Sequence, residues 1–340
     1  MLTQTESHLK AENDLLGNSP VVYLILYVYD IAESRDFYER RLGLRVIEAD
    51  DEAVKFDTGL VVLVLYKASD YGIDLTGRRD DASDVVFLVD DINSMRRALE
   101  ERGVVFLRRR TYEIGLVTDF YDPNGHRLML YQPSLEALTW PSAEKLRQAW
   151  RACGKGGTSL IGPSAFPIPD NAIDTEERTL DGKPLVYLFL FVPSSGEALA
   201  YYQGSLGLRM LENVHCCNPA CPPDELGIAK YDGGGMLLTT HHIHRTPVVD
   251  DFGRTYSPKL TDPAHTKGIV PVFHVNNIQE MVSKLSQRGI HFPNGIVRSQ
   301  IGYIAKFEAA TGHTFYLYEP SAGALQWPTG LRTKQILAGL

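Results

Sequence analysis

The chain has 340 residues, with a hydrophobic share of 44%, an aromatic share of 10% and a formal net charge of −8. This composition excludes a disordered protein, and the length suits two domains of roughly 130–150 residues each. The charged residues are spread along the chain without a basic stripe, which argues against nucleic acid or a membrane surface as a partner. Because the N-terminal segment lacks a signal-peptide core and no apolar run reaches the ~20 residues that span a bilayer, we expect a cytoplasmic protein.

A strand followed by a helix recurs four times along the chain. The first copy has an apolar strand at 23–30 and a helix at 32–44, in which Gly43 is the expected stop. The other copies have their strand and helix at 84–91 and 92–104, at 187–193 and 194–208, and at 270–277 and 278–290. Alternating apolar segments with Gly and Asp turns follow each helix and predict a meander of about three strands. Such self-similarity identifies an internal repeat.

Each repeat is therefore a βαβββ module, and the predicted fold class is α+β, with four modules paired into two tandem cup-shaped domains of mixed sheet. Consecutive modules are expected to pair, which gives a first domain at 20–140 and a second at 184–328. The remaining segments are predicted to be an N-terminal tail at 1–19, a connector at 141–183 that begins with a helix, an insert at 243–267 and a C-terminal tail at 329–340.

Three motifs resemble those of the vicinal oxygen chelate superfamily, which includes glyoxalase I, extradiol dioxygenases and bleomycin resistance proteins. They are FYERRLGL at 37–44, VDD at 89–91, and FYDPNGHRLMLYQP at 120–133 with its counterpart at 307–320. The resemblance covers most of the chain outside the tail, the connector and the insert. It implies that two modules close a sheet into a cup that holds a divalent metal ion between side chains at fixed strand positions.

The residues at those metal-ligand positions are not the usual His and Glu. The opening strands carry Tyr23, Asp84, Tyr187 and Val270, and the closing strands carry Met129 and Tyr316. A single Asp, tyrosines and apolar side chains do not make an ordinary site for Zn(II), Fe(II), Mn(II) or Ni(II). We therefore expect neither cup to carry a metal cofactor.

Side chains at every second strand position share a face, so these positions predict the lining of each cup. The second cup is expected to contain Tyr187, Phe189, Phe191, Val272, His274, Tyr316, Tyr318, Leu238, Thr240 and His242. The first cup is expected to contain Tyr23, Ile25, Tyr27, Asp84, Val86, Leu88, Met129 and Tyr131. Aromatic linings with a few polar groups suit a small planar organic ligand.

Within these linings, His242 and His274 are the candidates for acid–base work, with Tyr187 or Tyr316 as hydrogen-bond partner, because imidazole titrates near neutral pH. The predicted substrate-binding residues are Phe189, Phe191, Thr240, Val272, Tyr318, Tyr23 and Asp84. The alternative reading of both histidines is that they only bind ligand or satisfy core carbonyls. Asp84 could act as a general base, and the alternative is a turn-capping or rim residue.

Three functions are compatible with this sequence. The first is a metal-free enzyme that acts on a small aromatic or polyketide-like metabolite in the C-terminal cup. The second is a non-catalytic binding or resistance protein that sequesters a planar ligand. The third is a metal-dependent dioxygenase or lyase whose ligands are shifted to His242, His244 and either His274 or His265. A monomer and a homodimer are both compatible with four modules in one chain.

Overall fold

The computed structural model confirms the four βαβββ modules. It describes residues 14–75, 82–112, 114–155, 179–215, 226–242, 248–249, 255–256 and 268–340. Each module opens with a strand: β1 (Val21–Val28), β5 (Ser83–Leu88), β9 (Leu185–Val192) and β15 (Ile269–His274). A helix follows: α2 (Ile31–Arg35) continued by η1 (Asp36–Arg41), α3 (Ile92–Glu101), α5 (Ser195–Leu199) continued by η5 (Ala200–Ser205), and α6 (Ile278–Gln287).

Three further strands complete each module. Modules one and two contribute β2 (Arg45–Ala49), β3 (Ala53–Asp57), β4 (Val62–Lys67), β6 (Phe106–Tyr112), β7 (Gly115–Tyr121) and β8 (Arg127–Pro133). Modules three and four contribute β10 (Met210–His215), β11 (Leu226–Asp232), β12 (Leu237–His242), β16 (Ile296–Ser299), β17 (Gly302–Glu308) and β18 (Thr314–Pro320). The elements outside the modules are η2 (Ala68–Tyr71), η3 (Ala137–Thr139), α4 (Ala143–Trp150), η4 (Arg151–Lys155), β13 (Val248–Val249), β14 (Thr255–Tyr256), η7 (Ala324–Gln326) and α7 (Pro328–Gly339).

The same local signals begin and end the helix in every module. A short polar side chain caps each N-terminus by accepting a backbone N–H two or three residues on, and the four caps are Asp30, Asp91, Ser194 and Asn277. Each helix is followed by a glycine with positive φ, namely Gly43, Gly103, Gly207 and Gly289. Only glycine adopts that conformation without strain, so these positions set where each helix stops.

The modules pair in a different order from the predicted one. One eight-stranded sheet has the order β16-β17-β18-β15-β1-β4-β3-β2 and joins modules one and four, and the other has the order β10-β11-β12-β9-β5-β8-β7-β6 and joins modules two and three. The opening strands meet antiparallel, with Tyr23 opposite Val272 and Asp84 opposite Phe189. The predicted pairing within 20–140 and within 184–328 is therefore wrong. All four opening strands offer the same kind of free edge, so similarity between repeats does not determine which edges join.

Consecutive modules still share a core through the helix-covered faces of the two sheets. Between modules one and two, the rings of Phe37 and Phe120 lie 6.3 Å apart, and the Tyr38 hydroxyl donates to Asp122 at 3.0 Å. Between modules three and four, the rings of Tyr202 and Phe315 lie 6.0 Å apart. These contacts belong to one apolar cluster that spans both sheets.

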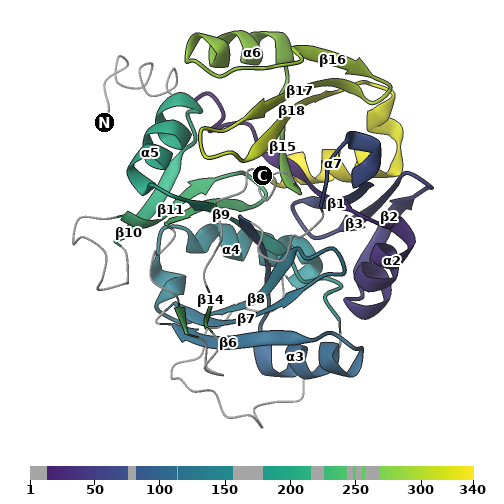
Figure 1. The fold of residues 1–340 in the computed structure, drawn as a ribbon, viewed down its shortest axis with the longest axis vertical. Helices are drawn as coiled ribbons and strands as arrows, with labels where there is room; N and C mark the ends of the chain where they lie inside the picture. The colour runs from purple at the N-terminus through teal and green to yellow at the C-terminus, as the bar shows by residue number, and fades with distance from the viewer. Residues whose placement is uncertain are drawn as a thin grey trace.

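The opposite, concave face of each sheet is covered by a helix that follows the closing strand of module two or module four. We call the concave face of the sheet of modules one and four cup A, and that of modules two and three cup B. In Figure 1, helices α2, α3, α5 and α6 lie at the periphery, whereas α4 and α7 lie in the interior. The predicted connector helix is confirmed as α4, but the segment predicted as a C-terminal tail at 329–340 is largely the helix α7, which packs on cup A. Within the described residues, no helix combines the length and apolarity that a membrane span needs.

Candidate functional site

Cup A is lined by aromatic and aliphatic side chains from four strands. The lining consists of Tyr23, Ile25, Tyr27, Val62, Val64, Tyr66, Val270, Val272, Tyr316 and Tyr318. Strand register explains the set, because β1 pairs with β4 and β15, and β15 pairs with β18, so that alternate residues of each strand face the same side.

The phenols of cup A form a connected group. The hydroxyls of Tyr27 and Tyr316 lie 3.2 Å apart. The ring of Tyr71, from the short helix η2, packs against the rings of Tyr27 at 5.2 Å and Tyr66 at 5.3 Å between centroids. Tyr71 is 51% exposed and marks the mouth of the cup, whereas Tyr66 and Tyr316 are half-buried. Burial raises the pKa of Tyr27, Tyr66 and Tyr316, so these phenols stay protonated at neutral pH and can donate hydrogen bonds.

Helix α7 closes one side of cup A. The hydroxyls of Tyr23 and Thr333 are 2.7 Å apart, and Ile336 of the same helix is fully buried against the lining. Near the start of the helix, Thr329 donates to Glu48 of β2 at 2.6 Å. Tyr23 occupies the position at which the superfamily resemblance places a metal ligand, and here its hydroxyl is bonded to α7 instead.

His274 ends strand β15 beside Tyr318, at the edge of cup A. Its side chain is half-buried, and burial lowers the pKa of the imidazole, against the opposing effect of the Glu319 charge. The ring is therefore neutral at pH 7 and can accept a proton.

Cup B has the same construction with different side chains. Its apolar lining includes Val86, Met129, Tyr131, Tyr187, Phe189 and Leu237, and α4 contributes Leu146, Ala149 and Trp150. At the start of α4, the backbone N–H and hydroxyl of Ser142 donate to Glu212 at 3.0 Å each. The Lys230 ammonium forms an ion pair with the same Glu212 and lies 4.7 Å from the centre of the Trp140 ring. This arrangement repeats the contact between Thr329 and Glu48 in cup A.

A buried ion pair is the main polar feature of cup B. Asp84 is 3% exposed and Arg127 is 1% exposed, and the guanidinium donates to both carboxylate oxygens, with Nη2 2.5 Å from Oδ2. Burial raises the pKa of Asp84 to about 6, and the positive charge of Arg127 limits the increase. The guanidinium carbon also lies 5.2 Å from the centre of the Phe191 ring. Asp84 thus faces the inside of a cup and is not a turn cap or a rim residue, but it lies in cup B and not in the cup that it was predicted to share with Tyr23.

The register of β12 corrects three predicted lining residues, namely Leu238, Thr240 and His242. Strand β12 pairs in parallel with β9, which places Leu237, Thr239 and His241 beside Tyr187, Phe189 and Phe191. Thr240 and His242 therefore face the opposite side of the sheet, where Leu190 and Val192 belong to the helix-covered core. The prediction was displaced by one residue, which reverses the face. Counting five residues from Asp57 reaches Val62, and counting five from Asp232 reaches Leu237, so the internal repeat contained the correct register.

The residue that the sequence reasoning missed is His241. Its ring lies 5.5 Å from Phe191 and 6.1 Å from Phe189 between centroids, on the concave face of cup B.

The four predicted acid–base residues do not form one site. His274 and Tyr316 lie in cup A, Tyr187 lies in cup B, and His242 lies on the other face of the second sheet. The predicted binding residues divide in the same way. Tyr23, Val272 and Tyr318 are in cup A, Asp84, Phe189 and Phe191 are in cup B, and Thr240 is in neither.

The donor set does not favour an ordinary metal centre in either cup. Among the described residues, no three His, Cys, Asp or Glu side chains gather in a group that could hold a metal ion. His242 and His274, two members of the shifted-ligand hypothesis, lie on different sheets, while His244 and His265 fall outside the described residues.

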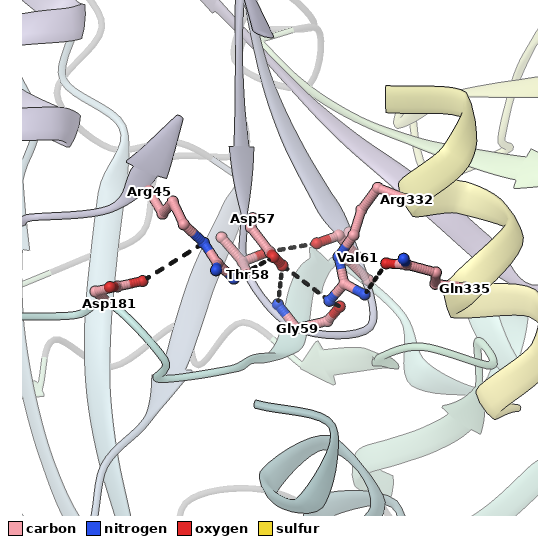
Figure 2. Close-up of polar contacts among 8 residues, drawn as sticks. All are labelled: Arg45, Asp57, Thr58, Gly59, Val61, Asp181, Arg332 and Gln335. Carbon is pink, nitrogen blue, oxygen red and sulfur yellow. Dashed lines mark hydrogen bonds and ion pairs between the residues drawn. The ribbon is translucent and has the colours of Figure 1, made fainter. Parts of the chain in front are cut away.

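Two adjoining cavities lie between the ends of α4 and α7, with volumes of about 370 and 590 Å³. Beside them, Asp57 accepts hydrogen bonds from Arg45 at 2.6 Å and from Arg332 of α7 at 2.9 Å, as Figure 2 shows. This cluster attaches α7 to the turn between β3 and β4.

Comparison with known proteins agrees with this architecture. A sequence model described as the Glyoxalase/Bleomycin resistance protein/Dioxygenase superfamily matches residues 21–130. Glyoxalase I from Zea mays has a similar structure, with a TM-score of 0.52, 14% identity, and coverage of 94% of this chain and 96% of that chain. A putative dioxygenase from Bacillus subtilis subsp. subtilis str. 168 gives a TM-score of 0.53 and 13% identity, with coverage of 94% and 96%.

At these identities the likeness to both structures is one of fold. No curated protein is significantly similar to the chain in sequence. Residues 21–130 thus match the superfamily of glyoxalases, bleomycin resistance proteins and dioxygenases in sequence, and nearly the whole chain shares the fold of glyoxalase I and of the putative dioxygenase.

Proposed function

We propose that the protein binds a small planar organic molecule in cup A and transfers a proton on it without a divalent metal, as a lyase or isomerase of its superfamily. The observation that carries the proposal is the phenol group of cup A. Tyr27 and Tyr316 are joined by their hydroxyls, and Tyr66 and Tyr71 present ring faces beside them at a half-exposed mouth. Ring faces bind a flat molecule, and neutral phenols bind its polar edge.

His274 is the proposed base. It is neutral at pH 7 because burial lowers its pKa, and it stands two residues after Val272, which pairs with Tyr316 across the strands. A substrate seated between these side chains would lose a proton to His274, while the Tyr316 hydroxyl donates a hydrogen bond to the oxygen on which negative charge develops. The proposed site combines modules one and four and replaces the single C-terminal cup that the sequence predicted.

The alternative function is sequestration of the same kind of ligand without turnover. One observation favours it, because burial raises the pKa of every phenol at the bottom of the cup, which makes those phenols weak acids. Both functions use the same binding surface and differ only in whether His274 takes a proton.

The test begins with thermal melting of the purified protein in the presence of planar aromatic carbonyl compounds and, separately, of Fe(II), Mn(II), Zn(II) and Ni(II). We expect stabilisation by a planar compound and none by the metals. Each compound that binds is then tested for exchange of its acidic protons with deuterium from solvent. We expect exchange in the wild type and its loss in His274→Gln with binding retained. Binding without exchange supports sequestration, whereas stabilisation by a metal alone contradicts both functions.

A further inference from the structure

The two cavities between α4 and α7 form one continuous region at the junction of the helices that cover the cups. Both are lined by Ala152, Arg332 and Gln335. The amide of Gln148 on α4 donates to the carbonyl of Gly339 on α7 at 2.9 Å, which joins the two helix ends beside the cavities. Volumes of 370 and 590 Å³ fall in the range of small-molecule sites, which is about 300–1,000 Å³.

The lining carries an excess of positive charge. Three arginines contribute to it: Arg45, Arg151 and Arg332. Among the described lining residues, two carry a carboxylate: Asp57, which binds Arg45 and Arg332, and Glu144, which binds Arg151 at 2.7 Å. Asp181, outside the lining, lies 4.0 Å from Arg45.

Arg332 retains hydrogen-bonding capacity after these contacts. Its Nη2 donates to Asp57 at 2.9 Å and to the Gly59 carbonyl at 2.6 Å, and its Nη1 donates to Gln335 at 3.3 Å. Its Nε is buried and has no hydrogen-bond partner among the described residues. A buried donor without a partner is unfavourable unless a ligand or water accepts its hydrogen bond.

The sheet of modules two and three shows which side chain is enough to attach a covering helix to the hairpin turn beneath it. There, Asp232 accepts from Arg209 and from Lys145 of α4 at 2.8 Å, and the Lys145 ammonium also reaches the Gly234 carbonyl at 3.4 Å. Lys145 and Arg332 each lie four residues after a Trp-Pro pair. A lysine therefore suffices to attach α4 to its hairpin turn. The guanidinium group of Arg332 on α7 has more N–H donors than such an attachment needs.

We propose that this junction binds a small molecule through an oxyanion, a carboxylate or a phosphate group, with Arg332 as the main ligand and Arg151 and Gln335 as supporting ligands. Guanidinium groups bind both oxyanions through parallel hydrogen bonds. Because α7 covers cup A and α4 covers cup B, the bound anion holds the ends of both covering helices in place. Binding at the junction should therefore raise the melting temperature of the whole chain.

The experiment titrates the full-length protein with inorganic phosphate and with acetate, each against sodium chloride at equal ionic strength, and follows heat release and thermal melting. The key variant is Arg332→Lys. It keeps a positive charge that can bind Asp57, as Lys145 binds Asp232, and it removes the additional N–H donors of the guanidinium group. Its control is Lys145→Arg, which makes the opposite change in the other half. We expect at least tenfold weaker anion binding in Arg332→Lys, a smaller loss in Arg151→Gln, and wild-type binding in Lys145→Arg.

Saturation by phosphate at the lower concentration identifies a phosphate ligand, and saturation by acetate at the lower concentration identifies a carboxylate; either result supports the site. The proposal is overturned if neither anion gives a response beyond that of chloride, or if Arg332→Lys binds as tightly as the wild type.

Discussion

Cup A and cup B are built on the same framework, yet their linings differ in charge. Asp84 faces Phe189 in cup B where Val270 faces Ile25 in cup A, and Arg127 pairs with Asp84 on the neighbouring strand. Cup B therefore contains a buried ion pair, whereas cup A at that position is apolar. The two linings also differ at one aromatic position, where cup B has His241 and cup A has Tyr66.

The two halves share the contacts that stabilise the fold and differ in the side chains that line the cups. The contacts that attach the covering helix are duplicated, namely Thr329 with Glu48 and Ser142 with Glu212. The inner surfaces are not duplicated. A lining that differs between two copies of one framework is where a ligand site can exist in one copy and a structural interaction in the other.

The largest expected effect comes from breaking the ion pair that distinguishes cup B. Asp84→Ala leaves the guanidinium of Arg127 buried without its carboxylate, and loss of one partner of a buried pair costs about 3–5 kcal/mol of unfolding free energy. Chemical denaturation measures the change. The matched change in cup A, Val270→Ala, removes only apolar volume and should cost less. Equal losses in the two variants would contradict the assignment of Asp84 as a structural charge.

The second prediction concerns the loss of unfolding free energy as the pH falls. His313 is completely buried in the turn before β18, where its Nε2 lies 3.0 Å from the Ala82 carbonyl, and burial lowers its pKa to about 4. In the unfolded chain the His313 imidazole binds a proton near pH 6.5. Its contribution to the unfolding free energy is therefore complete above that pH and falls by about 3 kcal/mol in total as the pH decreases toward 4. Asp84, with a raised pKa, acts in the opposite direction below pH 6.

The two contributions are separated by comparing the wild type with His313→Gln between pH 7 and pH 4. The variant is expected to be less stable at pH 7 and to lose less stability on acidification than the wild type does. Parallel curves for the two proteins would show that His313 does not titrate in this range.

A smaller effect is expected where α7 meets cup A. Tyr23→Phe removes the hydrogen bond to Thr333 and leaves the ring in place, so the expected cost is about 1 kcal/mol. Thr333→Val also removes the hydrogen bond that the Thr333 hydroxyl donates to the Thr329 carbonyl, so the double variant should lose little more than Thr333→Val alone. Additive losses, measured by denaturant unfolding, would argue against this contact between the helix and the cup.

The smallest effect should be the same in both halves. Arg45 and Arg209 bind Asp57 and Asp232 from side chains that are 64% and 54% exposed. Ion pairs on exposed side chains contribute roughly 0–1 kcal/mol, so Arg45→Gln and Arg209→Gln should each change the unfolding free energy by less than that upper value. A much larger loss in only one of them would show that the two anchors are not equivalent.

The sequence predicted the modules well because local signals specify them. Caps such as Asp30 and stop glycines such as Gly43 act within a few residues, and their fourfold recurrence made the βαβββ unit recognisable. The pairing of modules depends on strand edges that are all alike, and it joins strands that are far apart in the sequence, such as β1 and β15. For that reason it could not be read from the repeats.

The candidate site was predicted in part. Inward-facing positions such as Tyr23, Asp84 and Tyr316 were identified because alternation along a strand is a local property. His241 was missed through a displacement of one residue in β12, although its distance from Asp232 matches that between Tyr66 and Asp57. The role of α7 was missed because whether a terminal helix covers a cup depends on contacts such as Thr333 with Tyr23.

The most direct test of the central proposal compares Tyr316→Ala with Met129→Ala in a thermal-shift screen of planar aromatic compounds. These residues occupy equivalent places on the closing strands of cup A and cup B, beside Val272 and Val86. We predict compounds that stabilise the wild type and Met129→Ala but have no effect on Tyr316→Ala. Compounds that stabilise Tyr316→Ala and not Met129→Ala would place the ligand in cup B and contradict the account.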